Sequence, residues 1–144
     1  MNRSKRKKIM DIARRVRFWA EELYDEDQKD KAYFYEDLGG MCGIVSTKLC
    51  YELQRENISA KIGCNNYHAF VLIEKYILDV TATQFDSKFK KVMFFRPKEK
   101  EKEIYSFWDI DNISDTPNDF IKFQKDSEWD DTQCAYHFSK KIFD

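Results

Sequence analysis

Three residues near the middle of the chain have types and an order that suit thiol-based acyl transfer. Cys42 follows the pair Gly39-Gly40, His68 begins an apolar segment, and Asp79 lies in the next apolar segment. In enzymes of this kind a base activates the thiol as a nucleophile, and a carboxylate orients the base. The order Cys, His, Asp therefore predicts a catalytic triad, if the fold brings the three side chains together.

The segment that starts at Cys42 has the periodicity of an amphipathic helix up to about residue 56. Cys42, Val45, Leu49 and Leu53 lie within one stripe of that helix. At a helix start, the helix dipole and the free N–H groups favour a thiolate and can stabilise an oxyanion. The structural alternative is a buried and inert cysteine, because a cysteine on an apolar stripe often serves only in packing.

A hairpin is expected to bring His68 and Asp79 together. With a two-residue loop at Glu74-Lys75, the two side chains share one face of the sheet, roughly 5 to 7 Å apart at their Cβ atoms. A loop of odd length would place them on opposite faces. A buried polar group without a partner costs about 1 to 3 kcal/mol, so we expect the two side chains to bond each other.

Helices and strands must position these three side chains. The remaining sequence predicts an α+β fold in one domain over residues 1–144, with the motif region at 39–85. We expect an antiparallel sheet packed against the helix that bears Cys42. Helices are predicted over 5–24, 42–56 and 132–143. Strands are predicted over 58–64, 68–73, 76–85, 91–96 and 104–108, with a strand or turn over 32–38. Charged loops are expected at 25–31 and 98–103, and residues 109–131 are expected to be irregular, with one helical turn near Phe120.

Four stretches of the middle region resemble the transglutaminase-like superfamily. They read Gly-Met-Cys-Gly-Ile-Val-Ser-Thr-Lys-Leu at 40–49, Asn-Ile-Ser-Ala-Lys-Ile-Gly at 57–63, His-Ala-Phe-Val-Leu-Ile at 68–73 and Tyr-Ile-Leu-Asp-Val-Thr at 76–81. The resemblance implies a papain-like fold in which Cys42 is the nucleophile, His68 the base and Asp79 the orienting acid. It also implies an activity on amide bonds of a peptide or protein, as a peptidase, deamidase or transglutaminase. A catalytically inactive binding or adaptor module on the same fold is the alternative.

Further residues are candidates for the oxyanion hole or for substrate binding. They are Gln84, Tyr67, Gly40 and Tyr35, with Trp108 as another candidate for a substrate cleft. Packing or surface positions are the structural alternative for each aromatic residue and for Gln84. Cys64 could form a redox pair with Cys42. No CxxC or HExxH spacing supports a zinc site built from Cys42, Cys64, His68 and Asp79, so we predict no metal and no cofactor.

The charges nearly balance, with 25 Lys and Arg against 26 Asp and Glu. This argues against nucleic acid as an obligate partner. Basic residues nevertheless crowd positions 3–17, and acidic residues crowd 109–131. Solvation or mutual attraction of the two ends is the simpler interpretation. A basic arm that binds nucleic acid or another anionic partner is the alternative.

No signal peptide or membrane-spanning segment is expected, and the four cysteines do not form a dense disulfide pattern. The sequence therefore predicts a cytoplasmic protein. Delivery into another cell without a cleavable signal is the alternative. The sequence makes no prediction of the oligomeric state.

Overall fold

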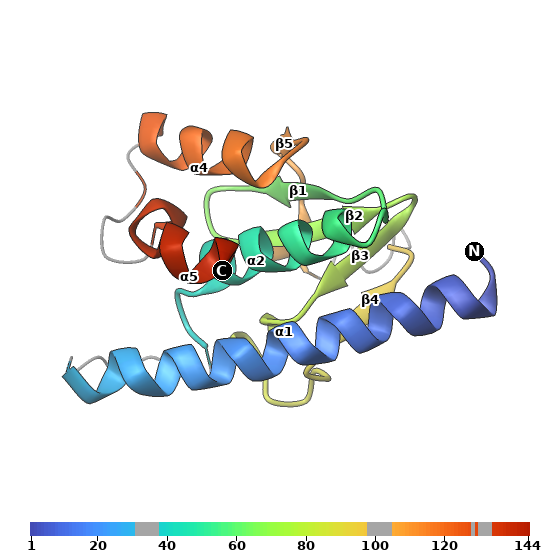
Figure 1. Cartoon of the computed structure of the whole chain (residues 1–144), viewed down its shortest axis with the longest axis horizontal. Coiled ribbons are helices and arrows are strands. Elements are labelled where there is room, and N and C mark those ends of the chain that lie inside the picture. Colours follow the sequence, from blue (N-terminus) through green and yellow to red (C-terminus); the bar gives the residue numbers. More distant parts are fainter. Residues whose placement is uncertain (31–37, 98–104, 128, 130–133) are drawn as a thin grey trace.

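Five short strands form one antiparallel sheet in the described part of the chain (Figure 1). They are β1 (Lys61–Cys64), β2 (Ala69–Ile73), β3 (Tyr76–Asp79), β4 (Met93–Phe95) and β5 (Asn112–Ser114). Their order is β4-β3-β2-β1-β5, so β4 and β5 are the edges. The computed structural model describes residues 1–30, 38–97, 105–127, 129 and 134–144. The chain has the α+β architecture expected from its sequence.

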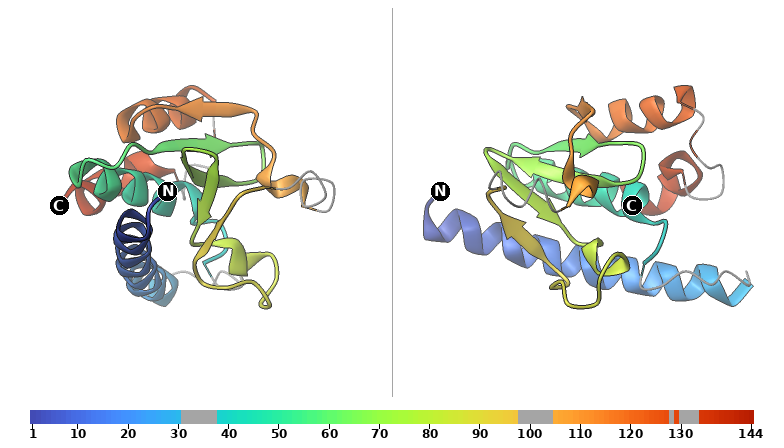
Figure 2. Two further views of the ribbon diagram at one scale, coloured as in Figure 1. Left: turned by 90° about the vertical axis from the view of Figure 1, so that its right-hand side faces the viewer. Right: turned by 180° about the vertical axis from the view of Figure 1, so that it is seen from behind.

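The helices of the described residues gather largely on one side of this sheet. They are α1 (Arg3–Asp30), α2 (Cys42–Arg55), α4 (Pro117–Asp126) and α5 (Ser139–Phe143), with 3-10 helices η1 (Ala82–Gln84), η2 (Ser106–Trp108) and η4 (Ala135–Phe138). Figure 2 shows α1 end-on beside α2, with both helices on the same side of the sheet. Because α2 is enclosed by its neighbours, most of its residues are buried. The predicted packing of the sheet against the helix that bears Cys42 is confirmed.

The hairpin of β2 and β3 has the register that the sequence predicted. Ile73 pairs with Tyr76 across the two-residue loop, and Val71 pairs with Leu78. Glu74 has a φ of 54°, a left-handed conformation that such a tight loop requires. The even loop length therefore places His68 and Asp79 on one face, as expected.

The two faces of the sheet are covered differently. Ala69, Val71 and Leu78 face the main core, which the helices complete. Phe70 and Ile77 face a second cluster, in which Trp108 and several other aromatic side chains cover the opposite side. The helices cover one face of the sheet and the aromatic cluster covers the other. This explains why the central strands are apolar on both faces.

The first helix is longer than predicted. It runs from Arg3 to Asp30, so the expectation of a charged loop from residue 25 is wrong as far as residue 30. No glycine or proline interrupts residues 21–30, and Glu, Lys and Gln are good helix formers. The strand or turn predicted over 32–38 and the loop predicted over 98–103 lie, except for Leu38, outside the described residues.

Strand β3 ends earlier than predicted, at Asp79 rather than near residue 85. The Asp79 side chain accepts a hydrogen bond from the backbone N–H of Thr81, at 2.8 Å. That bond takes a donor that a continuing strand would need, and the chain turns into η1. Strand β1 is also shorter than predicted and begins at Lys61.

The second half of the chain differs most from expectation. Residues 106–108 form η2 instead of a strand, and β4 pairs with β3. The region 109–131, expected to be irregular, contains β5 and α4. A start signal for α4 was present in the sequence, because Thr116 caps the helix through the Asp119 N–H and Pro117 follows it. The predicted terminal helix is divided into η4 and α5.

Candidate functional site

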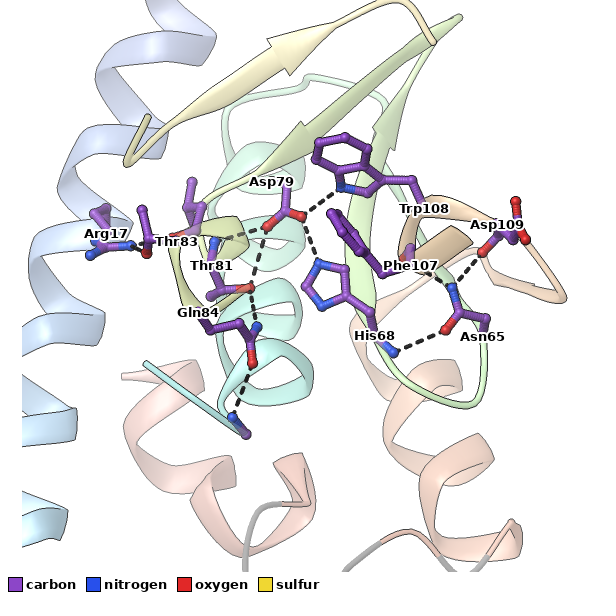
Figure 3. A network of polar contacts seen from close by, with 12 residues as sticks. Arg17, Asn65, His68, Asp79, Thr81, Thr83, Gln84, Phe107, Trp108 and Asp109 are labelled. Atoms are coloured by element: carbon purple, nitrogen blue, oxygen red, sulfur yellow. Dashed lines mark hydrogen bonds and ion pairs between the residues drawn. The ribbon is translucent and has the colours of Figure 1, made fainter. Parts of the chain in front are cut away.

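A short hydrogen bond joins His68 to Asp79 at the edge of the second cluster (Figure 3). Nε2 of His68 lies 2.6 Å from Oδ2 of Asp79. The exposed fraction is 0% for His68 and 2% for Asp79. The pairing predicted from the hairpin register is therefore present, and water has little access to it.

Asp79 accepts hydrogen bonds through both of its carboxylate oxygens. Oδ2 also accepts from Nε1 of Trp108 at 2.8 Å, and Oδ1 accepts from the N–H and the hydroxyl of Thr81 at 2.8 and 3.3 Å. Such a set of donors favours the ionised carboxylate. Trp108 was considered as a cleft residue, but its indole N–H is directed at the carboxylate.

The charges of the pair stabilise each other. Burial alone lowers the pKa of His68, but the charge and hydrogen bond of Asp79, with a smaller contribution from Cys42, outweigh burial and raise this pKa above its ordinary 6.5. Burial raises the pKa of Asp79, but His68, Thr81 and Trp108 together bring it below its ordinary 3.8. The ionised Asp79 therefore stabilises the imidazolium that forms when His68 takes up a second proton.

Asn65 holds the backbone just before β2. Its side-chain oxygen accepts from the N–H groups of Tyr67 and His68 at 2.8 and 3.1 Å. Its amide nitrogen donates to the carbonyls of Phe107 and Asp109 at 2.9 and 2.8 Å. One buried side chain thus connects the loop before His68 with the segment that carries Trp108 (Figure 3).

Cys42 is the first residue of α2 and faces the same group. Its thiol is close enough to His68 to contribute to the raised pKa of that imidazole. Nδ1 of His68, opposite the Asp79 bond, has no hydrogen-bond partner among the described residues. A thiol beside an imidazole nitrogen that is still available is the arrangement in which a proton can move from sulfur to nitrogen.

The start of α2 also provides free backbone donors. Its first hydrogen bond runs from the N–H of Val45 to the carbonyl of Met41, at 2.9 Å. The N–H groups of Cys42, Gly43 and Ile44 precede that bond and have no acceptor within the helix. Amides in this position can stabilise a negative charge on a substrate oxygen.

Gln84 connects the turn before Cys42 with the Asp79 network. Its Oε1 accepts from the N–H of Gly40 at 3.2 Å, and its Nε2 donates to the Thr81 hydroxyl at 3.3 Å. Gly40 has a φ of 79°, which only glycine adopts without strain. The contacts of Gln84 and Gly40 therefore position the turn, and a continuous series of hydrogen bonds runs from Gly40 through Thr81 to Asp79 (Figure 3).

An aromatic roof, formed by Phe85 and Phe107, covers His68. The Phe85 ring meets the imidazole edge-on at 4.8 Å between centroids, and the Phe107 ring does so at 6.0 Å. The two phenyl rings stack on each other at 4.3 Å. Cys42 itself is only 5% exposed, whereas Phe85 is 40% exposed. The Cys42 thiol is thus buried in this structure, and the roof over His68 is partly at the surface.

The other sequence candidates lie around this group or outside the description. Tyr67 is 82% exposed in the loop before His68. Tyr35 lies outside the described residues. Cys64, near Cys42 at the end of β1, is a buried free thiol, and burial raises its pKa to about 11. Among the described residues no group of three or more His, Cys, Asp or Glu side chains could hold a metal ion.

Sequence reasoning missed several residues that organise the site. It interpreted Asn65 only as part of a turn, although an Asn whose oxygen accepts from the second and third following amides is a known turn pattern. It did not assign a role to Phe85, Phe107 or Thr81. The ring contacts of Phe85 and Phe107 cross between distant segments, so no local pattern indicated them. Thr81 bonds Asp79 only two residues earlier, in a local turn.

Comparisons with known proteins do not name a family for this fold and site. No family model, no curated protein and no solved structure matches the chain. The described helices also include none that is long and apolar enough to cross a bilayer. Arguments about function therefore depend on the geometry of the residues themselves.

Proposed function

We propose that the chain is a cysteine-dependent hydrolase or acyl transferase that acts on amide bonds of a peptide or protein, with a papain-like, transglutaminase-like fold. The observation that carries the proposal is the buried 2.6 Å bond between His68 and Asp79, with the other imidazole nitrogen unpartnered and the Cys42 thiol nearby. Such a pair is costly to bury unless its charges compensate each other, and it orients the imidazole toward the thiol.

The chemistry follows from these positions. Nδ1 of His68 takes the proton of the Cys42 thiol, and the thiolate attacks the carbonyl carbon of the amide. The free N–H groups at the start of α2 stabilise the oxyanion. As the C–N bond breaks, the imidazolium gives its proton to the leaving amine, and a thioester remains on Cys42. Water then releases an acid, or an amine releases a new amide.

The burial of Cys42 and His68 favours a second candidate, a catalytically inactive binding module. A cysteine that is only 5% exposed is what an inert structural cysteine would look like. The enzyme requires that Cys42 becomes accessible when a substrate arrives, whereas the module requires no movement. The reactivity of Cys42 in the native protein separates the two.

The test is alkylation of the native protein by iodoacetamide over a series of pH values, read for each cysteine by mass spectrometry. The enzyme predicts that Cys42 reacts well below about pH 8.5, where ordinary thiols titrate. His68→Ala is expected to slow this reaction at neutral pH by about tenfold or more, because the neighbouring imidazolium is lost. Circular dichroism confirms that the variant is folded.

Cys50 is the internal control. It is fully buried, and burial raises its pKa to about 12, so it must stay unmodified as long as the protein is native. If Cys42 stays unmodified under the same conditions, or reacts equally in wild type and His68→Ala, the proposal of an enzyme is refuted. The inactive module then takes its place.

A further inference from the structure

A groove runs between helix α1 and the edge strand β4, away from Cys42. Two adjoining hollows of about 380 and about 560 Å³ make up this α1–β4 groove. Both are lined by Met10, Lys90 and Val92, which makes them continuous. Phe89 lines the smaller of the two hollows, and its ring also contacts Phe107 of the roof at 6.0 Å between centroids.

The groove is strongly basic in a chain whose net charge is −1. Its basic side chains are Arg6, Arg14, Arg17, Lys88, Lys90 and Lys91. Among the described residues the only acidic side chain that lines it is Glu21, which pairs with Arg17 at 2.9 Å and Lys91 at 3.3 Å. Arg14 also pairs with Asp11, outside the groove, at 3.4 Å. The six basic side chains still outnumber these two acidic partners, so a positive potential remains along the groove and suits an anionic occupant.

Helix α1 presents basic and apolar side chains in alternation along this groove. Arg6, Met10, Arg14 and Phe18 follow one another at intervals of four residues and all line it. Four residues of helix advance by about 6 Å. In an extended chain, every second side chain is on the same face, at intervals of about 6.6 Å. The two repeats match over a short segment.

The apolar positions distinguish a peptide from a nucleic acid. Met10 and Val92 are half-buried, and Phe18 is 64% exposed, so apolar surface is left uncovered between the charges. A nucleic-acid backbone would neutralise the basic groups but would leave these side chains against its phosphates. An extended protein segment can meet both kinds of side chain. Its acidic residues would pair with the basic groups, and the apolar residues between them, on the same face, would cover the exposed apolar surface.

We infer that the α1–β4 groove binds an extended protein segment in which an acidic, an apolar, an acidic and an apolar residue stand at every second position. Its acidic side chains pair with Arg14 and the neighbouring basic groups, and its apolar side chains cover Met10 and Phe18. Binding does not require the thiol chemistry of Cys42. If that chemistry holds, the bound segment leads through Phe89 toward the roof over His68.

The test uses a fluorescein-labelled peptide, Glu-Ser-Leu-Ser-Glu-Ser-Leu, and fluorescence anisotropy. A control peptide, Glu-Ser-Glu-Ser-Leu-Ser-Leu, has the same composition without the alternation. We expect the first peptide to bind about tenfold more tightly than the second. Affinity should fall as NaCl rises from about 50 to about 300 mM. The Cys42→Ser variant should bind equally well, which separates this inference from the proposed enzyme activity.

The double variant Arg14→Glu/Lys90→Glu is expected to weaken binding by about tenfold or more. The matched control is Lys122→Glu/Lys140→Glu, which makes the same charge change on exposed positions outside the groove and should bind like wild type. Circular dichroism confirms that both variants are folded. Equal affinity for the two peptides, equal loss in both double variants, absent binding, or tighter binding of a single-stranded oligonucleotide of similar length would each overturn the inference.

Discussion

At the scale of single residues, Asp79 is the centre of the site. Four donors on His68, Thr81 and Trp108 bond its two oxygens. Water cannot take the place of a lost donor, because the carboxylate is almost fully buried. A buried charge of this kind is stable only as long as its partners remain. Asp79 therefore orients His68 and also contributes to the stability of the fold.

Asp79→Asn tests this contribution through its pH dependence. The change keeps the shape but removes the charge, and we expect the free energy of unfolding to fall by about 3 kcal/mol near neutral pH. The pKa of Asp79 is lowered in the folded state, so its stabilisation is present above the ordinary 3.8 and is lost as the pH falls through the lower folded value. The difference between wild type and variant should thus be largest near pH 5 and should shrink below about pH 4. It should also shrink as the pH rises above about 6.5, because the raised pKa of His68 depends on the same carboxylate.

Urea unfolding at a series of pH values measures this difference. Asp109→Asn is the control, because the Asp109 side chain is exposed and only its backbone carbonyl takes part in the Asn65 contact. It should change stability by less than about 0.5 kcal/mol. A difference for Asp79→Asn that persisted unchanged into strong acid would contradict the assignment of a charged carboxylate.

At the scale of elements, the start of α2 is held closely by α4. Gly43 has no side chain, and a Cβ there would meet Nε2 of Gln124 at 2.4 Å. The Gln124 amide is fully buried, and its oxygen is fixed by the N–H of Ala135 at 2.9 Å. The residue beside Cys42 must therefore be small if α4 is to pack against this end of the helix.

Gly43→Ala should destabilise the protein even though alanine is the better helix former. The added methyl displaces the fixed amide, at a cost of about 1 to 3 kcal/mol, which exceeds the gain of about 1 kcal/mol in helix propensity. In a Gln124→Ala background the obstacle is absent, and the same substitution should become neutral or stabilising. A double-mutant cycle by urea unfolding measures this change of sign, and additive effects of the two substitutions would refute the close contact.

At the scale of the whole molecule, α1 is connected to the site through one buried side chain. Arg17 is 3% exposed, and its Nη1 donates to the Val80 carbonyl and the Thr83 hydroxyl, each at 2.9 Å. These acceptors stand between Asp79 and Gln84, in the segment that supports Gly40. The helix thus stabilises the turn that positions Cys42 against His68.

Arg17→Ala is expected to lower the free energy of unfolding by about 3 kcal/mol, because it removes a buried, hydrogen-bonded charge and leaves its acceptors without a donor. Arg15→Ala, at an exposed position of the same helix, serves as the control and should cost less than about 0.5 kcal/mol. Thermal or urea unfolding measures both. Equal effects of the two substitutions would show that the bonds of Arg17 do not anchor α1.

Local patterns were enough to predict the parts of the site that depend on periodicity and loop length. The apolar stripe located the helix start at Cys42, and the two-residue loop at Glu74-Lys75 set the common face of His68 and Asp79. Both follow from backbone geometry within a few residues, where 3.6-residue turns and alternating strand faces leave little choice.

Contacts between distant segments were decided only by tertiary packing. Trp108 reaches Asp79 across 29 residues, and Gln84 reaches Gly40 across 44. The roof of Phe85 and Phe107 likewise joins separate segments over His68, and the packing of the whole domain leaves Cys42 only 5% exposed. Sequence periodicity does not predict such long-range contacts, because they depend on how all the elements pack around one core. The residue types and their order thus indicate a chemistry, and the packing around them decides which groups bond, how deeply they are buried and what must move.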